Sequence, residues 1–281
     1  MPSNYIRQLK ELLQEQTQEE LAERLGVSFA ALNRWVNGHA RPHKSNLLLI
    51  DKLYKELIAY PKLDAKAIKQ IIQDTKALKR KQLWKQIQNN IKLQEELILE
   101  HTYNSNTIEG STFTKRETES VLFNNQTIQG KDLKEHLELV NHSNVLREVL
   151  HMTYPVKTSE ALVKSLHYKL MQGIRQDIPD EINRLIQDFN ATKVKTLKDI
   201  AKFHVDFELI HPFGDGNGRV GRLLMLMQCL SLDLPPVIIH DAKKLTYYDT
   251  LYYAQTKHEG AFIEFVYKEM LDTARIIDRY L

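Results

Sequence analysis

His211-Pro-Phe-Gly-Asp-Gly-Asn-Gly-Arg-Val-Gly-Arg222 is the most informative stretch of this sequence. Three glycines and one asparagine follow each other closely in it, so backbone N–H groups can converge in a tight turn. The apolar run from Val220 to Leu230 predicts a helix that begins at this turn. Together these features predict an anion-binding turn at the N-terminus of a helix.

Four side chains of this stretch suit phosphate chemistry. Arg219 and Arg222 are three residues apart, so they share one helical face and offer positive charge to polyphosphate oxygens. Asp215 is an oxygen ligand of the kind that holds Mg²⁺ on phosphates, and His211 can accept a proton near neutral pH. A proton acceptor, a phosphate cradle, a metal carboxylate and charge neutralisers so close together predict a phosphotransfer site.

The same stretch resembles the motif of the Fic family, HxFx(D/E)GNGRxxR, at all eight specified positions. Two further segments extend the resemblance. Gly130–Leu146 (GKDLKEHLELVNHSNVL) is similar to the family's early core helices, and Lys243–Gln255 (KKLTYYDTLYYAQ) is similar to its later adenine-side segment. The resemblance covers roughly residues 100 to 270 and implies a helical Fic-type core.

Fic proteins mostly transfer AMP from ATP to a Ser, Thr or Tyr hydroxyl of a target protein and release pyrophosphate. The resemblance implies the same activity here, with ATP and Mg²⁺ as cofactors and a hydroxyl-bearing protein as partner. It also implies that His211 is the base for the target hydroxyl and that Asp215 holds Mg²⁺.

The resemblance assigns a phosphate-binding set as well. The backbone amides of Gly216, Asn217 and Gly218 would cradle phosphate. Arg219 and Arg222 would bind the β and γ phosphates and so act in catalysis.

On the adenine side, Tyr247 and Tyr248 match a tyrosine pair that lines the family's nucleotide pocket. Gln255 stands where many relatives carry asparagine. The related Doc kinases have a different phosphate turn that lacks the full GNGR sequence. Because this chain keeps GNGR, the resemblance favours nucleotidyl transfer over phosphorylation.

Ser105-Asn-Thr-Ile-Glu-Gly110 resembles the family's inhibitory pattern (S/T)xxxE(G/N) and precedes the core, as in the subgroup with an N-terminal inhibitory helix. A carboxylate at Glu109 would pair with Arg222 and occupy the guanidinium that the γ phosphate needs. The resemblance therefore implies autoinhibition through Ser105 and Glu109. The ordinary alternative for Glu109 is an acid on a helix surface.

Two other functions remain open. In this family the inhibitory glutamate can also align water to remove AMP, so the chain is alternatively a de-AMPylating hydrolase. A second alternative is a transcriptional regulator that uses the Fic fold as a nucleotide sensor. His211 argues against the second alternative, because sensing needs no base.

Residues 17 to 38 (TQEELAERLGVSFAALNRWVNG) predict two short helices separated by a turn. Thr17 and Glu20 form a capping box that starts the first helix, and Gly26 provides the turn. Ser28 caps the second helix, and Asn37-Gly38 ends it. This pattern resembles the repressor-like helix-turn-helix family, whose second helix enters the DNA major groove.

The resemblance places the early, outward positions of the second helix against base edges: Ser28, Phe29, Ala30, Asn33 and Arg34. Arg41 and Lys44 follow the helix and are placed for phosphates. The presumed contact face carries no acid, which favours DNA as the partner. The alternative is a module for protein docking or dimerisation, so a homodimer stays open.

A length of 281 residues suits two domains, and only ten glycines and eight prolines interrupt the helical patterns. We therefore predict an all-α protein, with a helix-turn-helix domain at residues 1–60 and a Fic domain at 61–281. The boundary is placed near Pro61. Residues 62 to 92 predict basic helices, whose lysines suit either a solvated face or nucleic acid.

Several classes of protein are disfavoured. The longest apolar stretch, Leu223 to Ile239, is interrupted by polar residues and prolines, and the first residues are charged where a signal peptide is apolar. A cytoplasmic location without membrane partners is expected. Cys229 is the only cysteine and lies in an apolar run, which predicts a buried, inert thiol. The β-hairpin flap that Fic enzymes usually carry is missing from the sequence near Asp177.

Overall fold

The computed structural model describes residues 4–60, 63–174, 182–192, 195–256 and 258–281. These residues form helices, turns and loops without a β-strand, which confirms the all-α prediction. They divide into two compact units, Met1–Leu63 and Asp64–Leu281. The missing flap was predicted at residues that lie outside the described ranges.

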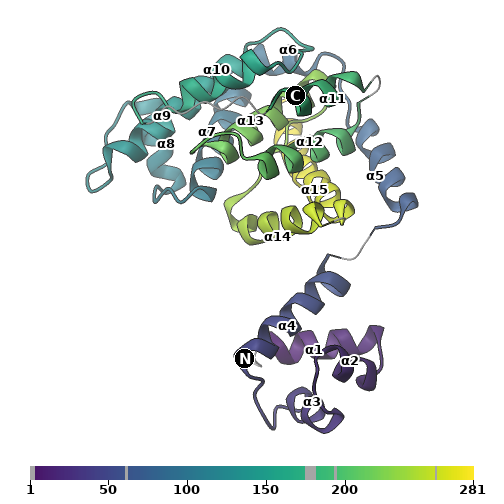
Figure 1. Cartoon of the computed structure of the whole chain (residues 1–281). Helices are drawn as coiled ribbons and strands as arrows, with labels where there is room; N and C mark the ends of the chain where they lie inside the picture. Colours follow the sequence, from purple (N-terminus) through teal and green to yellow (C-terminus); the bar gives the residue numbers. More distant parts are fainter. Residues whose placement is uncertain (1–3, 61–62, 175–181, 193–194, 257) are drawn as a thin grey trace. The chain divides into compact units, whose positions relative to one another are not determined.

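The first unit is a small helical domain (Figure 1). Its helices are α1 (Asn4–Glu15), α2 (Gln18–Arg24), α3 (Phe29–Val36) and α4 (Lys44–Tyr54), followed by the π-helical turn η1 (Lys55–Ala59). Apolar side chains from all four α-helices meet in one core, among them Leu9, Leu21, Leu32 and Ile50.

Local chemistry sets the ends of α2 and α3. The Thr17 hydroxyl accepts from the backbone N–H of Glu20, and the Glu20 carboxylate accepts from that of Thr17, which completes the predicted capping box. Gly26 has φ +64° in the turn, a conformation that favours glycine. The Ser28 hydroxyl caps α3 by accepting from the N–H of Ala31 at 3.2 Å.

The second unit is a helical bundle. Its helices are α5 (Ala65–Ala77), α6 (Leu83–Gln88), α7 (Ile91–Ile108), α8 (Lys115–Asn124), α9 (Leu133–Leu150), α10 (Glu160–Leu170), α11 (Asn183–Ala191), α12 (Leu197–Ile210), α13 (Asn217–Ser231), η2 (Asp241–Lys243), α14 (Lys244–Gln255) and α15 (Glu259–Asp278).

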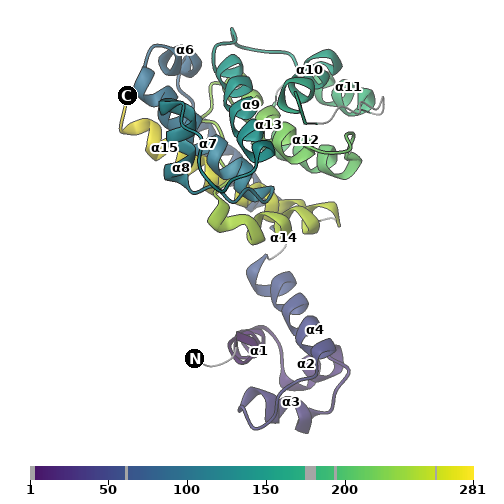
Figure 2. The same ribbon diagram turned by 90° about the vertical axis from the view of Figure 1, so that its left-hand side faces the viewer.

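Helix α13 forms the centre of this unit, and every residue from Asn217 to Leu230 is buried. It packs against α7, α9, α10 and α12, and Figures 1 and 2 both show it between α9 and α12. The helix begins at Asn217, so Gly218 and Arg219 belong to its first turn. Cys229 is fully buried on this helix, and burial raises the pKa of its thiol to about 12. The predicted inert thiol fits this environment.

The predicted basic helices correspond to α5 and α6. Ile68 and Ile71 of α5 pack against the core. Ile91 is the first residue of α7 and is 72% exposed. Among the described residues, none of the helices is long and apolar enough to cross a membrane.

Candidate active site

The motif loop connects the end of α12 to the start of α13. His211 ends α12 with φ +50°, in the left-handed region, and is exposed. The Asn217 side chain closes the loop, since its Nδ2 donates to the Phe213 carbonyl at 2.6 Å and its Oδ1 accepts from the Phe213 N–H at 2.9 Å. Gly216 precedes the helix with φ +82°. The loop therefore has a fixed shape, with His211 at its α12 end and Asn217 at its α13 end.

Helix α10 packs against this loop. The His167 ring stacks on Phe213 with centroids 3.8 Å apart, and its Nε2 lies 3.0 Å from the carbonyl oxygen of Asp215. A side chain at Gly216 would put its Cβ only 2.9 Å from Met171 Sδ. A larger residue would therefore displace the Met171 side chain, and the backbone conformation at this position also favours glycine.

Arg222 is 2% exposed. It is held by Ser105 of α7 and by Glu109, the C-cap residue of that helix. Its Nε donates to Ser105 Oγ at 2.8 Å, and its Nη2 donates to the Ser105 carbonyl at 3.0 Å and to Glu109 Oε1 at 2.8 Å. Burial alone would lower the pKa of Arg222, but the Glu109 carboxylate raises it above its ordinary value. The structure thus brings together Ser105, Glu109 and Arg222.

Glu109 also lies on the anion-binding turn itself. A Cβ at Gly218 would lie 2.2 Å from Glu109 Oε1, so the carboxylate touches the first turn of α13. That turn is where exposed N–H groups and the helix dipole attract negative charge. The Glu109 carboxylate therefore lies beside Gly218 and Arg222, two of the residues for which the sequence predicts phosphate contacts.

Arg219 is 3% exposed and lies between two carboxylates. Its Nη1 is 3.1 Å from Glu138 Oε1 of α9, and its Nη2 is 3.3 Å from Asp215 Oδ1. Asp215 borders a cavity of about 440 Å³ that Lys134, Gly173, Ile174 and Gly214 also line. Sequence analysis did not predict the contact of Glu138 with Arg219, because the sequence around Glu138 is that of an ordinary charged helix.

Behind the arginines lies a layer of buried polar groups. His204 Nε2 and the Tyr247 hydroxyl are 2.9 Å apart, and the His204 ring stacks on Phe262. Burial, reinforced by the charge of Arg222, lowers the pKa of His204 to about 3. Burial raises the pKa of Glu208 to about 7, although Arg222 opposes the shift. The His204 and Glu208 side chains both lie close to Gly221 of α13.

The adenine-side residues are less closely grouped than the motif. Tyr247 is 1% exposed and packs inside the core, whereas Tyr248 is 41% exposed and its hydroxyl donates to the Ile108 carbonyl at 3.4 Å. Tyr248 is therefore the more exposed residue of the pair, and it lies beside the end of α7. Gln255 is exposed at the last residue of α14.

Comparisons with known proteins match both parts of the chain. Residues 163–229 match the Fic/DOC family, and residues 6–59 match the helix-turn-helix family. The chain carries a Fic/DOC domain after a helix-turn-helix domain.

The relatives found by sequence are named after the same domain. A protein of Culex quinquefasciatus named protein adenylyltransferase Fic is 30% identical over 218 residues, and one of Aedes aegypti with the same name is 29% identical over 218 residues. Each alignment covers 67% of this chain but 42% of the relative. The chain thus spans less than half the length of these relatives.

Solved structures share the fold. Fic-1 of C. elegans (aa134–508) superposes with a TM-score of 0.62 at 20% identity, covering 92% of this chain and 84% of that one. A Fic domain containing signaling protein of Bacteroides thetaiotaomicron gives a TM-score of 0.60 at 19% identity, covering 76% of this chain and 99% of that one.

In the helix-turn-helix domain, the residues predicted to face DNA lie on one exposed face. Ser28, Phe29, Ala30, Asn33 and Arg34 are all exposed on or just before α3, whereas Leu32 and Trp35 are buried. Arg41 and Lys44 are exposed after the helix. Asn33 Oδ1 accepts from Asn37 Nδ2 at 2.9 Å, so this side chain is already oriented.

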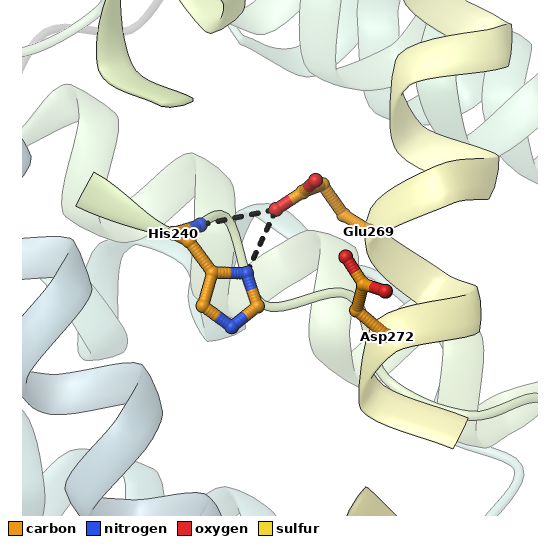
Figure 3. A group of neighbouring side chains, drawn as sticks. All are labelled: His240, Glu269 and Asp272. Carbon is orange, nitrogen blue, oxygen red and sulfur yellow. Dashed lines mark hydrogen bonds and ion pairs between the residues drawn. The ribbon is translucent and has the colours of Figure 1, made fainter. Parts of the chain in front are cut away.

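The second unit also contains a cluster that sequence analysis missed. His240, Glu269 and Asp272 offer ligand atoms within 4.8 Å of one another (Figure 3). Lys243 Nζ contacts the carboxylates of both Glu269 and Asp272, so these acids already have a cation. His240 Nδ1 lies 2.9 Å from Glu269 Oε2, and this hydrogen bond raises the pKa of His240. The cluster therefore fixes the segment before α14 to α15.

Proposed function

We propose that the chain is a protein adenylyltransferase that transfers AMP from ATP to a Ser, Thr or Tyr hydroxyl of a target protein. The observation that supports the proposal is the motif loop, which has the exposed His211 at the end of α12 and leads directly into α13, the helix that carries Arg219 and Arg222. The names of the relatives support it.

The residues present fit a magnesium-bound triphosphate. Arg219 Nε and Arg222 Nη1 are buried donors without a hydrogen-bond partner among the described residues, and an anion would supply acceptors for both. Asp215 is a hard oxygen donor, its side chain is 42% exposed, and it borders a cavity. When bound, Mg²⁺ would neutralise phosphate charge.

In the proposed reaction, the oxygen of the target hydroxyl forms a bond to the α phosphorus and the bond from that phosphorus to pyrophosphate breaks. His211 takes the hydroxyl proton. Arg219 and Arg222 stabilise the charge that develops on the leaving pyrophosphate. Because His211 ends one helix and the arginines begin the next, the short loop between them sets the distance between base and phosphates.

We further propose that Glu109 inhibits this reaction. Its carboxylate holds Arg222 at 2.8 Å and lies against Gly218, so a γ phosphate cannot approach both. The alternative, in which Glu109 aligns water for the removal of AMP, uses the same position of the carboxylate. A measurement of whether the chain adds AMP to its target or removes it therefore distinguishes the inhibitory role of Glu109 from its hydrolytic role.

The proposed activity predicts which phosphate reaches the protein. Incubation of the chain and host lysate with α-labelled ATP and Mg²⁺ should label protein above the level of lysate alone, whereas γ-labelled ATP should add no label above that control. The γ label leaves with pyrophosphate in AMP transfer, but it would be retained in phosphorylation. Label from γ-labelled ATP alone would contradict the proposal and favour a kinase.

We also propose that the helix-turn-helix domain binds DNA. Its exposed face around α3 supports this, since Arg34 and Asn33 are side chains that read base edges. The affinity for a specific duplex should fall steeply with salt, because phosphate contacts release counterions.

Arg34→Ala should weaken specific DNA binding by about 1 to 3 kcal/mol. Arg7→Ala is the matched control, because Arg7 is equally basic but lies on α1 and pairs with Glu11. Electrophoretic mobility shifts with genomic fragments, including the chain's own promoter, would measure both. Equal affinities of the two variants, or binding that ignores salt, would favour a docking module instead.

A further inference from the structure

We infer that Glu138 of α9 is a positioning residue for Arg219, and that nucleotide binding exchanges the ion-pair partners of Arg219 and Asp215. In the state described by the structure, Arg219 pairs with both Glu138 and Asp215. With nucleotide bound, Asp215 would turn to Mg²⁺ and Arg219 to a phosphate, while Glu138 would keep its hold on Arg219. The inference rests on the proposed nucleotide site.

The geometry separates the two ends of the guanidinium. Arg219 Nη1 lies 3.1 Å from Glu138 Oε1, and Arg219 Nη2 lies 3.3 Å from Asp215 Oδ1. Nε has no hydrogen-bond partner among the described residues. The Nη1 end is therefore anchored by another helix, and the Nε and Nη2 positions are those that a phosphate can use.

The two carboxylates differ in how easily they can leave. The Glu138 side chain is 14% exposed and contacts an arginine that is 3% exposed, so water screens this pair poorly. The Asp215 side chain is 42% exposed and borders the cavity, so its pair is weaker and can be replaced. The exchange should break the Asp215 contact and leave the Glu138 contact intact.

Asp215 Oδ1 also has a second donor, because the N–H of Gly216 reaches it at 2.6 Å. The carboxylate thus stays fixed to the loop when Arg219 leaves it. Charge balances in the exchange, since Asp215 receives Mg²⁺ in place of a guanidinium and Arg219 receives a phosphate in place of a carboxylate. Lys134 is the other cation at Glu138, at 3.7 Å, and its side chain is 61% exposed.

Loss of the Glu138 charge would strengthen the pairing of Arg219 with Asp215. Among the described residues, Arg219 would then have Asp215 as its remaining carboxylate partner, so Mg²⁺ would have to compete harder for Asp215. Nucleotide binding should consequently need more Mg²⁺, and the defect should shrink as Mg²⁺ rises. A purely structural defect would reduce the amount of active protein and would leave the Mg²⁺ requirement unchanged.

The test is calorimetric titration of the full chain with a non-hydrolysable ATP analogue at a series of Mg²⁺ concentrations. Glu138→Gln keeps the shape and removes the charge, and should raise the half-saturating Mg²⁺ concentration about tenfold, which a loss of about 1.4 kcal/mol produces. Glu138→Asp keeps the charge with a shorter side chain and should fall between parent and Glu138→Gln. Glu148→Gln is the control, because Glu148 lies on the same helix and pairs with Lys169 instead.

Arg219→Ala combined with Glu138→Gln should show no further change in Mg²⁺ requirement over Arg219→Ala alone, since the positioned group is gone. An unchanged Mg²⁺ requirement in Glu138→Gln would overturn the inference while the parent still binds nucleotide. If Glu138→Gln does not fold, the same comparison between Glu138→Asp and Glu148→Gln applies. A parent chain that binds no nucleotide would overturn the proposed function first, and the exchange with it.

Discussion

Glu109→Gly should raise the labelling of protein by α-labelled ATP well above that of the parent chain, by about 10- to 150-fold. This range corresponds to about 1.5 to 3 kcal/mol for the charge-assisted hydrogen bond that the change removes. The change frees Nη2 of Arg222, which Glu109 holds at 2.8 Å, and clears the carboxylate from Gly218. A γ phosphate can then dock and turn the α phosphate in line with the target hydroxyl.

The same change should destabilise the empty protein. Arg222 is 2% exposed, and a buried charge that loses its carboxylate is costly even though Ser105 still accepts two of its hydrogen bonds. ATP would supply the missing negative charge, so ATP should raise the unfolding temperature more in Glu109→Gly than in the parent. Thermal unfolding with and without ATP and Mg²⁺ measures this difference.

Two further variants test the pair as a unit. Glu109→Gln keeps an acceptor for Arg222 without the charge and should be intermediate in labelling. Arg222→Ala in the Glu109→Gly background should cancel the gain, because it removes the group whose release causes it. If Glu109→Gly labels no better than the parent, autoinhibition is wrong. Loss of AMP removal from a modified target in that variant would then assign Glu109 to hydrolysis.

The parts of the site that sequence analysis predicted are local or carried by a motif. The capping residues of α2 and α3 and the turn before α13 depend on neighbours within a few residues, so their patterns are visible in the chain. The contact between Glu109 and Arg222 is long-range, and the inhibitory pattern at residues 105–110 suggested it. Spacing alone does not bring two such distant segments together.

The parts that were missed depend on tertiary packing. Glu138, His167 and Met171 reach the motif from α9 and α10, and nothing in their own helices distinguishes them from ordinary surface or core residues. Tyr247 and Tyr248 show another limit. Neighbouring residues of a helix point in different directions, and the packing of α14 on α15 buries Tyr247 and leaves Tyr248 exposed.

His211→Asn should abolish the transfer of AMP and leave nucleotide binding intact, with a loss of at least about 10²- to 10⁴-fold in rate. Asparagine cannot take the proton of the target hydroxyl, whereas in the proposed site the turn of α13 and the two arginines would still hold the phosphates. The loss is best measured in the Glu109→Gly background, where the starting activity is high. Calorimetric titration with an ATP analogue measures the binding that should remain.

Asparagine is the informative replacement because of the backbone at this position. His211 has φ +50°, where asparagine is tolerated and alanine costs roughly 1 kcal/mol or more. His211→Ala should therefore lose as much transfer as His211→Asn but unfold at a lower temperature. Equal activity losses with unequal stabilities would assign the effect to the missing base and not to a distorted loop. Transfer by His211→Asn at the rate of its Glu109→Gly parent would mean that another group takes the proton.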